Sequence, residues 1–258
     1  MRLVNAPVLG ASRDTGDTIA QNGVPIGVPF WSGIGAIVAA LLIGFAGGLL
    51  FAIVIAICTG GSPDFTPGHL TDSLFTFVFY GLSGAFAWWA LNKLHGGVLH
   101  ALTRRDVIVA LAGVCVVFAV RIIGGLILVA LNAGDHVQAG FENFSVATSQ
   151  PSTTALAAIL ATVSLVIVAP IVEEVIFRGL LFGALSRPLG IAFAAIVSGL
   201  LFGALHGDLI FFPLLAALGI INAVVYARTQ NLAVPMIVHA ANNAIGALFL
   251  IPLALHAH

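Results

Sequence analysis

Long apolar runs separated by short polar segments repeat along most of the chain. Seven of these runs are candidate membrane spans, at residues 33–58, 71–91, 107–131, 154–185, 190–206, 209–227 and 234–250. The runs are continuously apolar rather than alternating, which favours helices over the strands of a membrane barrel. About 20 apolar residues in a helix cross the ~30 Å of hydrocarbon in a bilayer. The pattern therefore predicts an all-α polytopic transmembrane helix bundle of about seven spans.

The fourth run is too long for one perpendicular crossing. It carries Pro170 near its middle, and proline removes a backbone hydrogen bond from a helix. We expect this helix to tilt, to project from the membrane, or to break near Pro170. A break would add an eighth crossing, so the pattern leaves seven and eight spans open.

The composition excludes an ordinary soluble domain. The chain has 258 residues, of which 60% are hydrophobic and only 7% are charged, and its mean hydropathy is +1.14. Soluble domains have roughly 25% charged residues. The formal net charge is -1 and there is no basic tract, so nucleic acid is not an expected partner. We expect residues 1–32 to form an N-terminal tail and residues 33–258 to form one transmembrane domain surrounded by membrane lipids.

Lysine and arginine outside the spans fall only in alternate connections. The first, third and fifth connections contain none, while the N-terminal tail and the second, fourth and sixth connections contain Arg2, Arg13, Lys93, Arg104, Arg105, Arg187 and Arg228. Positive residues mark the cytoplasmic side of a membrane protein. The pattern predicts a cytoplasmic N-terminus, and the short loops favour a prokaryotic cytoplasmic membrane.

Two adjacent carboxylates and an arginine interrupt the fourth run at Glu173, Glu174 and Arg178. An ionisable residue within a span costs at least ~2.5–3.5 kcal/mol and is by default a functional candidate. Glu174 and Arg178 have the i,i+4 spacing of a helical ion pair, whereas Glu173 points about 100° away. The spacing predicts that Glu174 and Arg178 hold each other and that Glu173 acts as a general base. The alternative is a surface charge cluster on a helix that has left the membrane.

The fifth run ends with Phe202 and His206 on one helical face. Glu173 and His206 lie at similar distances, about 25 Å of helix, on either side of the turn at residues 187–190. An antiparallel hairpin therefore brings them to the same depth. The alternative is a histidine at the membrane interface.

His239 and Asn243 share a face of the last span, also at i,i+4. Together with Glu173 and His206 they form a hydrolytic set. Glu173 takes a proton from water, and His206 shares that proton or orients it. His239 and Asn243 donate hydrogen bonds to an oxyanion. Polar contacts between helices are the alternative for this pair. A zinc site of Glu173, His206 and His239 is chemically allowed, but the usual His-Glu-x-x-His helix is absent, so we expect no cofactor.

These motifs resemble the CPBP family, the type II CAAX prenyl endopeptidases and their bacterial CAAX protease and bacteriocin-processing relatives. The resemblance covers residues 154–250 and rests on Glu-Glu-x-x-x-Arg, Phe-x-x-x-His and His-x-x-x-Asn in this order. It implies an intramembrane glutamic endopeptidase that cuts hydrophobic or lipid-anchored peptides. Glu173, His206, His239 and Asn243 would be catalytic, supported by Glu174, Arg178 and Phe202. The family is often classed with the metalloproteases.

Two other classes of function fit the sequence less well. A proton- or cation-coupled transporter would use the carboxylates as ion carriers, but the chain has no inverted repeat. A silent immunity or scaffold protein would have little reason to bury so many polar groups. Arg121, in the middle of the third span, either pairs with a core carboxylate, touches a substrate carboxylate, or joins helices structurally.

Overall fold

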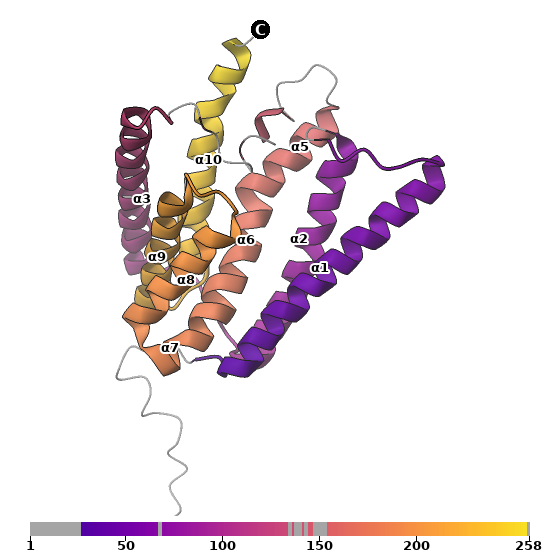
Figure 1. Ribbon diagram of the computed structural model, residues 1–258. Helices are drawn as coiled ribbons and strands as arrows, with labels where there is room; N and C mark the ends of the chain where they lie inside the picture. Colours follow the sequence, from indigo (N-terminus) through magenta and orange to yellow (C-terminus); the bar gives the residue numbers. More distant parts are fainter. Residues whose placement is uncertain are drawn as a thin grey trace, which may run out of the picture.

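The computed structural model describes residues 27–66, 69–133, 136, 141, 144–146 and 154–256, with side chains up to residue 248 in the last helix. Most of the predicted tail, residues 1–26, lies outside the described residues. Helices and connections make up the described chain, and no strand occurs in it. Figure 1 shows the helices running between two ends of an elongated bundle.

Each predicted apolar run coincides with a helix. In order, these are α1 (Phe30–Thr59), α2 (Leu70–Leu94), α3 (Arg104–Ala130), the composite helix Ala155–Leu189, α8 (Ile191–Leu205), α9 (Phe212–Thr229) and α10 (Ala233–His256). The all-α membrane bundle is therefore confirmed. Within the described ranges, five helices are long and apolar enough to cross a membrane, while α8 and the described part of α10 are shorter. The number of seven spans is not confirmed.

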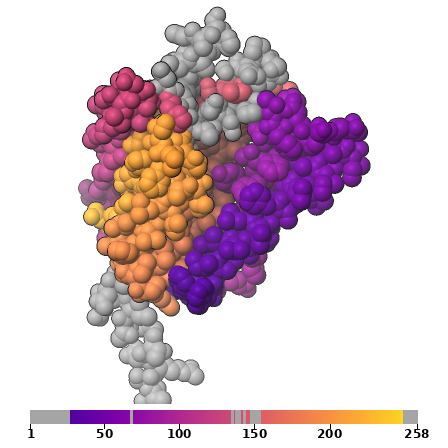
Figure 2. All heavy atoms as spheres, viewed as in Figure 1, coloured from indigo at the N-terminus to yellow at the C-terminus, as the bar shows by residue number. Residues whose placement is uncertain are grey.

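The outside of the bundle is apolar. Large aliphatic and aromatic side chains such as Leu49, Leu126 and Phe193 are about 60% or more exposed. In water such a surface would be unstable, whereas lipid tails surround it at no cost. The chain is an integral membrane protein. Figure 2 shows one face recessed between the indigo helix α1 and the orange helices, with atoms of the fourth run lying deeper.

The connections meet in the pairs that the charge pattern requires. At one end, the second and sixth connections are joined because Leu232 N–H donates to the Val98 carbonyl and Asn231 Nδ2 donates to the His100 carbonyl. At the other end, the third and fifth connections are joined by His136 and Asp208. The connections with and without cations therefore lie at opposite ends of the bundle (Figure 1).

Asp208 fixes the short connection between α8 and α9. Burial would raise the pKa of its carboxyl, but hydrogen bonds from the Phe211 N–H, the His136 ring and the Ile210 N–H outweigh burial and lower that pKa. His136 Nε2 lies 3.1 Å from Asp208 Oδ2. The carboxylate therefore stays ionised and ties the end of α8 to the third connection.

The fourth run is one continuous helix that widens twice. It passes from α5 (Ala155–Val163) through the π-helical η2 (Ser164–Val168), α6 (Ala169–Glu174) and the π-helical η3 (Val175–Phe182) into α7 (Gly183–Leu189). Pro170 therefore does not break it. Proline has no N–H and its ring crowds the preceding turn, and the wide turn of η2 just before it relieves that crowding. In η2 the Ala169 N–H donates to the Ser164 carbonyl, five residues back.

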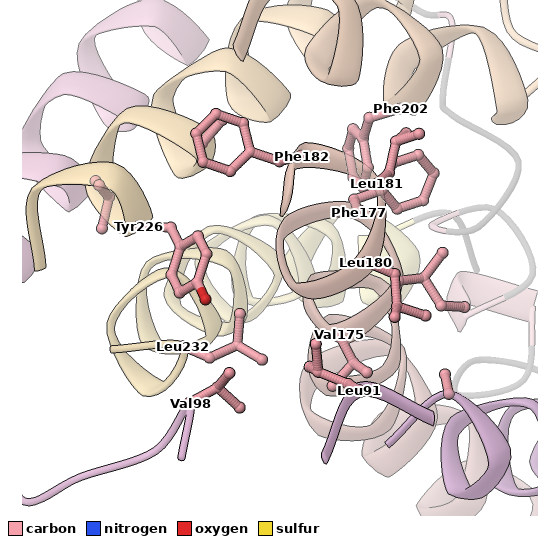
Figure 3. Packing of buried hydrophobic residues seen from close by; sticks show 14 of the residues in the cluster. Leu91, Val98, Val175, Phe177, Leu180, Leu181, Phe182, Phe202, Tyr226 and Leu232 are labelled. Carbon is pink, nitrogen blue, oxygen red and sulfur yellow. The ribbon is translucent and has the colours of Figure 1, made fainter. Parts of the chain in front are cut away.

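The core lies around η3. All eight residues of η3 are buried, among them Val175, Phe177 and Leu180. Figure 3 shows Phe177 and Phe202 facing each other from neighbouring helices, and Leu232 beside Val98 at the end where the second and sixth connections meet. This packing holds the carboxylates of α6 at a fixed depth.

Helices α8 and α9 approach most closely at two glycines. A Cβ on Gly219 would lie 2.7 Å from the Gly199 Cα, which is backbone that cannot yield. We expect Gly219→Ala to destabilise the protein by about 1–3 kcal/mol, because overpacking forces the two helices apart. Thermal unfolding in detergent measures the change.

Gly81→Ala is the matched control. No atom lies within 4 Å of a Cβ at this helical position, so alanine is expected to stabilise the helix by about 0.5–1 kcal/mol. Equal shifts of the melting temperature in Gly219→Ala and Gly81→Ala would contradict close packing at Gly219.

Candidate active site

Glu174 is the fully buried carboxylate of the site. Its Oε1 accepts from Asn222 Nδ2 at 2.9 Å and lies 2.9 Å from His239 Nδ1. Its Oε2 lies 3.1 Å from Arg178 Nε, so the ion pair expected from the i,i+4 spacing is present. Both side chains of the pair have zero exposure. Buried charges are tolerated only when they are paired. Glu174 Oε2 meets Arg178 as an ion pair without a hydrogen bond among the described residues, and Glu174 is held by structural contacts.

Arg178 receives further support from its surroundings. One of its terminal nitrogens donates to the Gly219 carbonyl at 3.0 Å. Its guanidinium carbon lies 4.8 Å from the centre of the Phe202 ring, the distance of a cation–π contact. Phe202 therefore contacts Arg178, and the supporting role that the resemblance implies for it stays a prediction.

Glu173 remains accessible. Its side chain is 15% exposed, against none for Glu174. Tyr80 of α2 donates to Glu173 Oε1 at 3.0 Å, and His239 Nε2 lies 3.8 Å from Glu173 Oε2. The two adjacent carboxylates thus differ in their environment, and only Glu173 has capacity left to bind water.

His239 bridges the two carboxylates. Because an ionised Glu174 can only accept, the His239 Nδ1 that faces it carries the proton. The Nε2 nitrogen, which faces Glu173, then accepts a hydrogen bond in the neutral ring and donates one only in the doubly protonated ring. In the latter form, His239 and Arg178 balance the charges of the two glutamates.

His206 lies near this group without touching Glu173. Among the described residues it has no hydrogen bond or ion pair to that carboxylate, and its Nδ1 lies 2.7 Å from the Phe202 carbonyl. Ser198 of α8 donates to the Phe177 carbonyl, so α8 packs antiparallel to the composite helix. The equal depth of Glu173 and His206 expected from the sequence stays a prediction.

The Phe202 ring connects the two histidines. Its centre is 4.7 Å from the His206 ring and 5.5 Å from the His239 ring. A helical side chain points back toward the start of its helix, so the His206 ring is directed from the end of α8 toward the layer of Glu173. Its Nε2 is free to accept a hydrogen bond from water, since Nδ1 must carry the proton that faces the carbonyl.

Asn243 is held against the wide turn before Pro170. Its Nδ2 donates to the Leu165 carbonyl at 2.9 Å. In the π-helical register of η2 that carbonyl would pair with the N–H of residue 170, which is a proline and has none. The proline thus leaves an acceptor that Asn243 satisfies. Asn243 has a second amide hydrogen, but it makes no described contact with Glu173.

The residues proposed for a zinc site do not come together as one. No group of three His, Cys, Asp or Glu side chains arranged to hold a metal ion occurs in the described part of the chain. The contacts of His239 Nδ1 with Glu174 and of His206 Nδ1 with a backbone carbonyl leave the Nε2 atoms of both rings available, and the expectation of no cofactor stays a prediction.

Comparisons with known proteins match this region. Residues 155–245 match the family model of the type II CAAX prenyl endopeptidases, described as Rce1-like. This segment is thus similar to the Rce1-like endopeptidases. It contains the composite helix, α8, α9 and most of α10, and the resemblance inferred from the motifs is confirmed for it.

Two curated bacterial proteins are also similar. "Putative membrane peptidase YdiL" of Bacillus subtilis (strain 168) is 32% identical over 126 residues, which cover 47% of this chain and 52% of that protein. "Membrane-embedded CAAX protease MroQ" of Staphylococcus aureus (strain USA300) is 35% identical over 89 residues, which cover 32% of this chain and 36% of that protein. The chain thus spans about half of the first relative and a third of the second. No solved structure matches.

Two residues of the site were missed in the sequence. Tyr80 lies in α2, outside the Rce1-like segment, and contacts Glu173 from there. Asn222 lies in α9 and contacts Glu174. Asn222 is a buried polar residue inside an apolar run, the signal that singled out the glutamates, and it could have been found by the same rule. Tyr80 gave no such signal because tyrosine is common in membrane helices.

Proposed function

We propose that the protein is an intramembrane endopeptidase in which Glu173 activates water. One observation carries the proposal: of two adjacent carboxylates in an apolar helix, Glu174 is fully buried and ion-paired with Arg178, and Glu173 is accessible beside the His239 imidazole. Similarity to the Rce1-like endopeptidases and to two bacterial membrane peptidases supports it. The substrate would be a hydrophobic or lipid-anchored peptide, and we expect no cofactor.

The chemistry follows from the positions of the donors and acceptors. Glu173 removes a proton from water, with His206 Nε2 orienting the molecule, and the oxygen adds to the peptide carbonyl carbon. The free amide hydrogen of Asn243 and a protonated His239 stabilise the resulting oxyanion. The C–N bond then breaks, and the proton held by Glu173 passes to the leaving amine. No covalent acyl-enzyme forms, and the products are a carboxylate and an amine.

The proposed orientation places the cationic connections in the cytoplasm. Arg187, Arg228 and the cations of the second connection lie at the end of the bundle where α1 begins. By the positive-inside rule this end faces the cytoplasm, so the N-terminus is cytoplasmic. The membrane is a bacterial cytoplasmic membrane, as expected for relatives from Bacillus and Staphylococcus.

Cleavage by the purified chain tests the proposal. The protein in lipid nanodiscs is incubated with membrane-anchored peptides, with and without a chelator, and fragments are identified by mass spectrometry. The proposal predicts cleavage that survives the chelator. Cleavage that stops with the chelator and returns with zinc would replace it by a metal mechanism. Coupled ion uptake into vesicles without any cleavage would favour a transporter. The absence of both cleavage and ion uptake would favour a scaffold.

Tyr80→Phe is expected to lower kcat by about tenfold and to leave KM unchanged. The hydroxyl donates to the charged Glu173, and hydrogen bonds to charged groups are worth about 1.5–3 kcal/mol; partial exposure places the effect at the low end. Without the hydrogen bond from Tyr80, the Glu173 carboxylate is less well oriented to take a proton from water. Steady-state cleavage measures the change.

Tyr226→Phe is the matched control. Tyr226 lies in α9 and is fully buried, whereas Tyr80 is half-buried. Among the described residues Tyr226 makes no hydrogen bond to the site, so loss of its hydroxyl should leave cleavage unchanged. Equal losses of kcat in the two variants would contradict a specific role for Tyr80.

A further inference from the structure

Arg121 lies in the middle of α3 and faces α10. One terminal nitrogen, Nη1, lies 3.2 Å from Asn242 Oδ1 and 3.5 Å from the Asn242 carbonyl. The guanidinium carbon is 5.3 Å from the centre of the Phe141 ring. Among the described residues no carboxylate pairs with Arg121. A guanidinium inside a membrane helix is costly, and this one is held inward by a neutral amide.

The cavity beside Arg121 is too small for a peptide. It lies between α3 and α10, is lined by Val114, Val117, Phe118, Arg121, Val238, Asn242 and Ile245, and has a volume of about 10 Å³. A single water needs roughly 10–15 Å³. The sequence left open that Arg121 pairs with a core carboxylate or touches a substrate carboxylate. The described residues support neither alternative.

A hydrogen-bond chain runs from Arg121 to the site. Asn242 Nδ2 donates to Asn243 Oδ1 at 3.0 Å, and Asn243 Nδ2 donates to the Leu165 carbonyl at 2.9 Å. Arginine can only donate and a backbone carbonyl can only accept. The two ends of the chain therefore fix the orientation of both amides, and neither asparagine can flip without losing bonds at both sides.

The chain crosses α10 from one face to the other. Asn242 faces α3, whereas Asn243 lies about 100° around the helix, on the face of His239. The guanidinium charge polarises the bonds that follow it, because hydrogen bonds in series strengthen one another in a medium of low dielectric. The amide hydrogen of Asn243 that is not used by Leu165 becomes a better donor as a result.

We propose that Arg121 and Asn242 are positioning residues that orient and polarise the Asn243 amide for the oxyanion of the proposed reaction. The inference rests on the proposed function. Arg121 acts through Asn242, and Asn242 acts through Asn243; neither touches the substrate.

Four variants test this relay, the hydrogen-bond chain from Arg121 through Asn242 to Asn243. Arg121→Met removes the charge and the donor, and Arg121→Lys keeps both. Asn242→Asp keeps an acceptor for Arg121, and adds a charge that pairs with it, but has no hydrogen to donate to Asn243. Val117→Ala removes packing from the same contact between α3 and α10 and leaves the hydrogen bonds of the relay in place. Each variant is compared with the wild type as the full chain in nanodiscs.

Two measurements are made on each variant. The first is the split between kcat and KM in peptide cleavage. The second needs no activity: the side-chain amide signals of ¹⁵N-asparagine-labelled protein, with the Asn243 signal identified by its absence in Asn243→Ala. Thermal unfolding shows how far each variant is destabilised.

The relay predicts a pattern that lost packing does not produce. Arg121→Met and Asn242→Asp should lower kcat about tenfold at unchanged KM and shift the Asn243 amide signal, and Arg121→Lys should restore most of both. Asn242→Asp should do this without loss of thermal stability. Val117→Ala should lower the melting temperature and leave kcat and the amide signal unchanged.

Other results overturn the relay or the activity separately. If the wild type cleaves but Arg121→Met and Asn242→Asp keep their kcat and their Asn243 signal, the relay is wrong and the proposed function stands. If the signal shifts as expected but the wild type cleaves nothing, the relay positions Asn243 and the proposed function is wrong. A loss of kcat that follows the melting temperature across all four variants assigns Arg121 to structure alone.

Discussion

Glu173→Gln is expected to abolish cleavage, with kcat reduced by about 10²–10⁴-fold, while the fold is retained. Glutamine has the same shape and its oxygen still accepts from Tyr80, which donates to Glu173 Oε1 in the wild type. It cannot take a proton from water, and general-base catalysis is worth about that factor. The side chain is partly exposed, so losing its charge should cost little stability. Peptide cleavage and thermal unfolding are measured on the same sample.

The outcome separates the proposed base from its neighbour. Ser83→Ala, in α2 and outside the site, serves as the control for substitution of a polar group within a span and should keep its activity. Full cleavage by Glu173→Gln would move the catalytic role elsewhere. A loss of activity accompanied by a collapse of the fold would show that the carboxylate is structural.

Arg178→Met is expected to destabilise the protein by about 3–5 kcal/mol. Methionine fills part of the space, but Glu174 is left as a fully buried carboxylate without its cation, and breaking a buried pair from one side is costly. The Gly219 carbonyl also loses its donor. Thermal unfolding in detergent and the yield of monodisperse protein measure the effect.

Two comparisons test the reason for this loss. Arg187→Met removes an exposed arginine from the last turn of α7 and should leave the melting temperature nearly unchanged. The double variant Glu174→Gln with Arg178→Met removes both charges and should recover part of the stability. A double variant that is less stable than Arg178→Met alone would contradict an uncompensated charge as the cause.

The parts of the fold that depend on local sequence were predictable. The helices fall where the apolar runs lie, since a bilayer leaves a backbone few alternatives. The contact between Glu174 and Arg178 follows from one helical turn. The grouping of the connections at two ends followed from where the cations lie, because alternate connections of a spanning bundle share a side.

The contacts between distant helices were not predictable from one sequence. Tyr80 reaches Glu173 across 93 positions of sequence, and no periodicity within α2 shows which residue will face α6. The contact of Ser198 with the Phe177 carbonyl was likewise not predictable, because the register of a helical hairpin depends on its turn and on the packing of its side chains. The wide turn at η2 was not predictable either, because the pattern left a tilt, a projection and a break near Pro170 all open.

The depth of Glu173 in its helix limits how a peptide can reach it. Glu173 lies 18 residues after Ala155 and 16 before Leu189, so about 27 Å and 24 Å of helix separate it from either end. At that depth an intact substrate helix has all of its carbonyls engaged in its own hydrogen bonds, and none is open to attack by water. In the proposed reaction, a substrate would therefore have to unwind or end within the membrane, and local helix stability in the substrate, rather than side-chain recognition alone, would decide where it is cut.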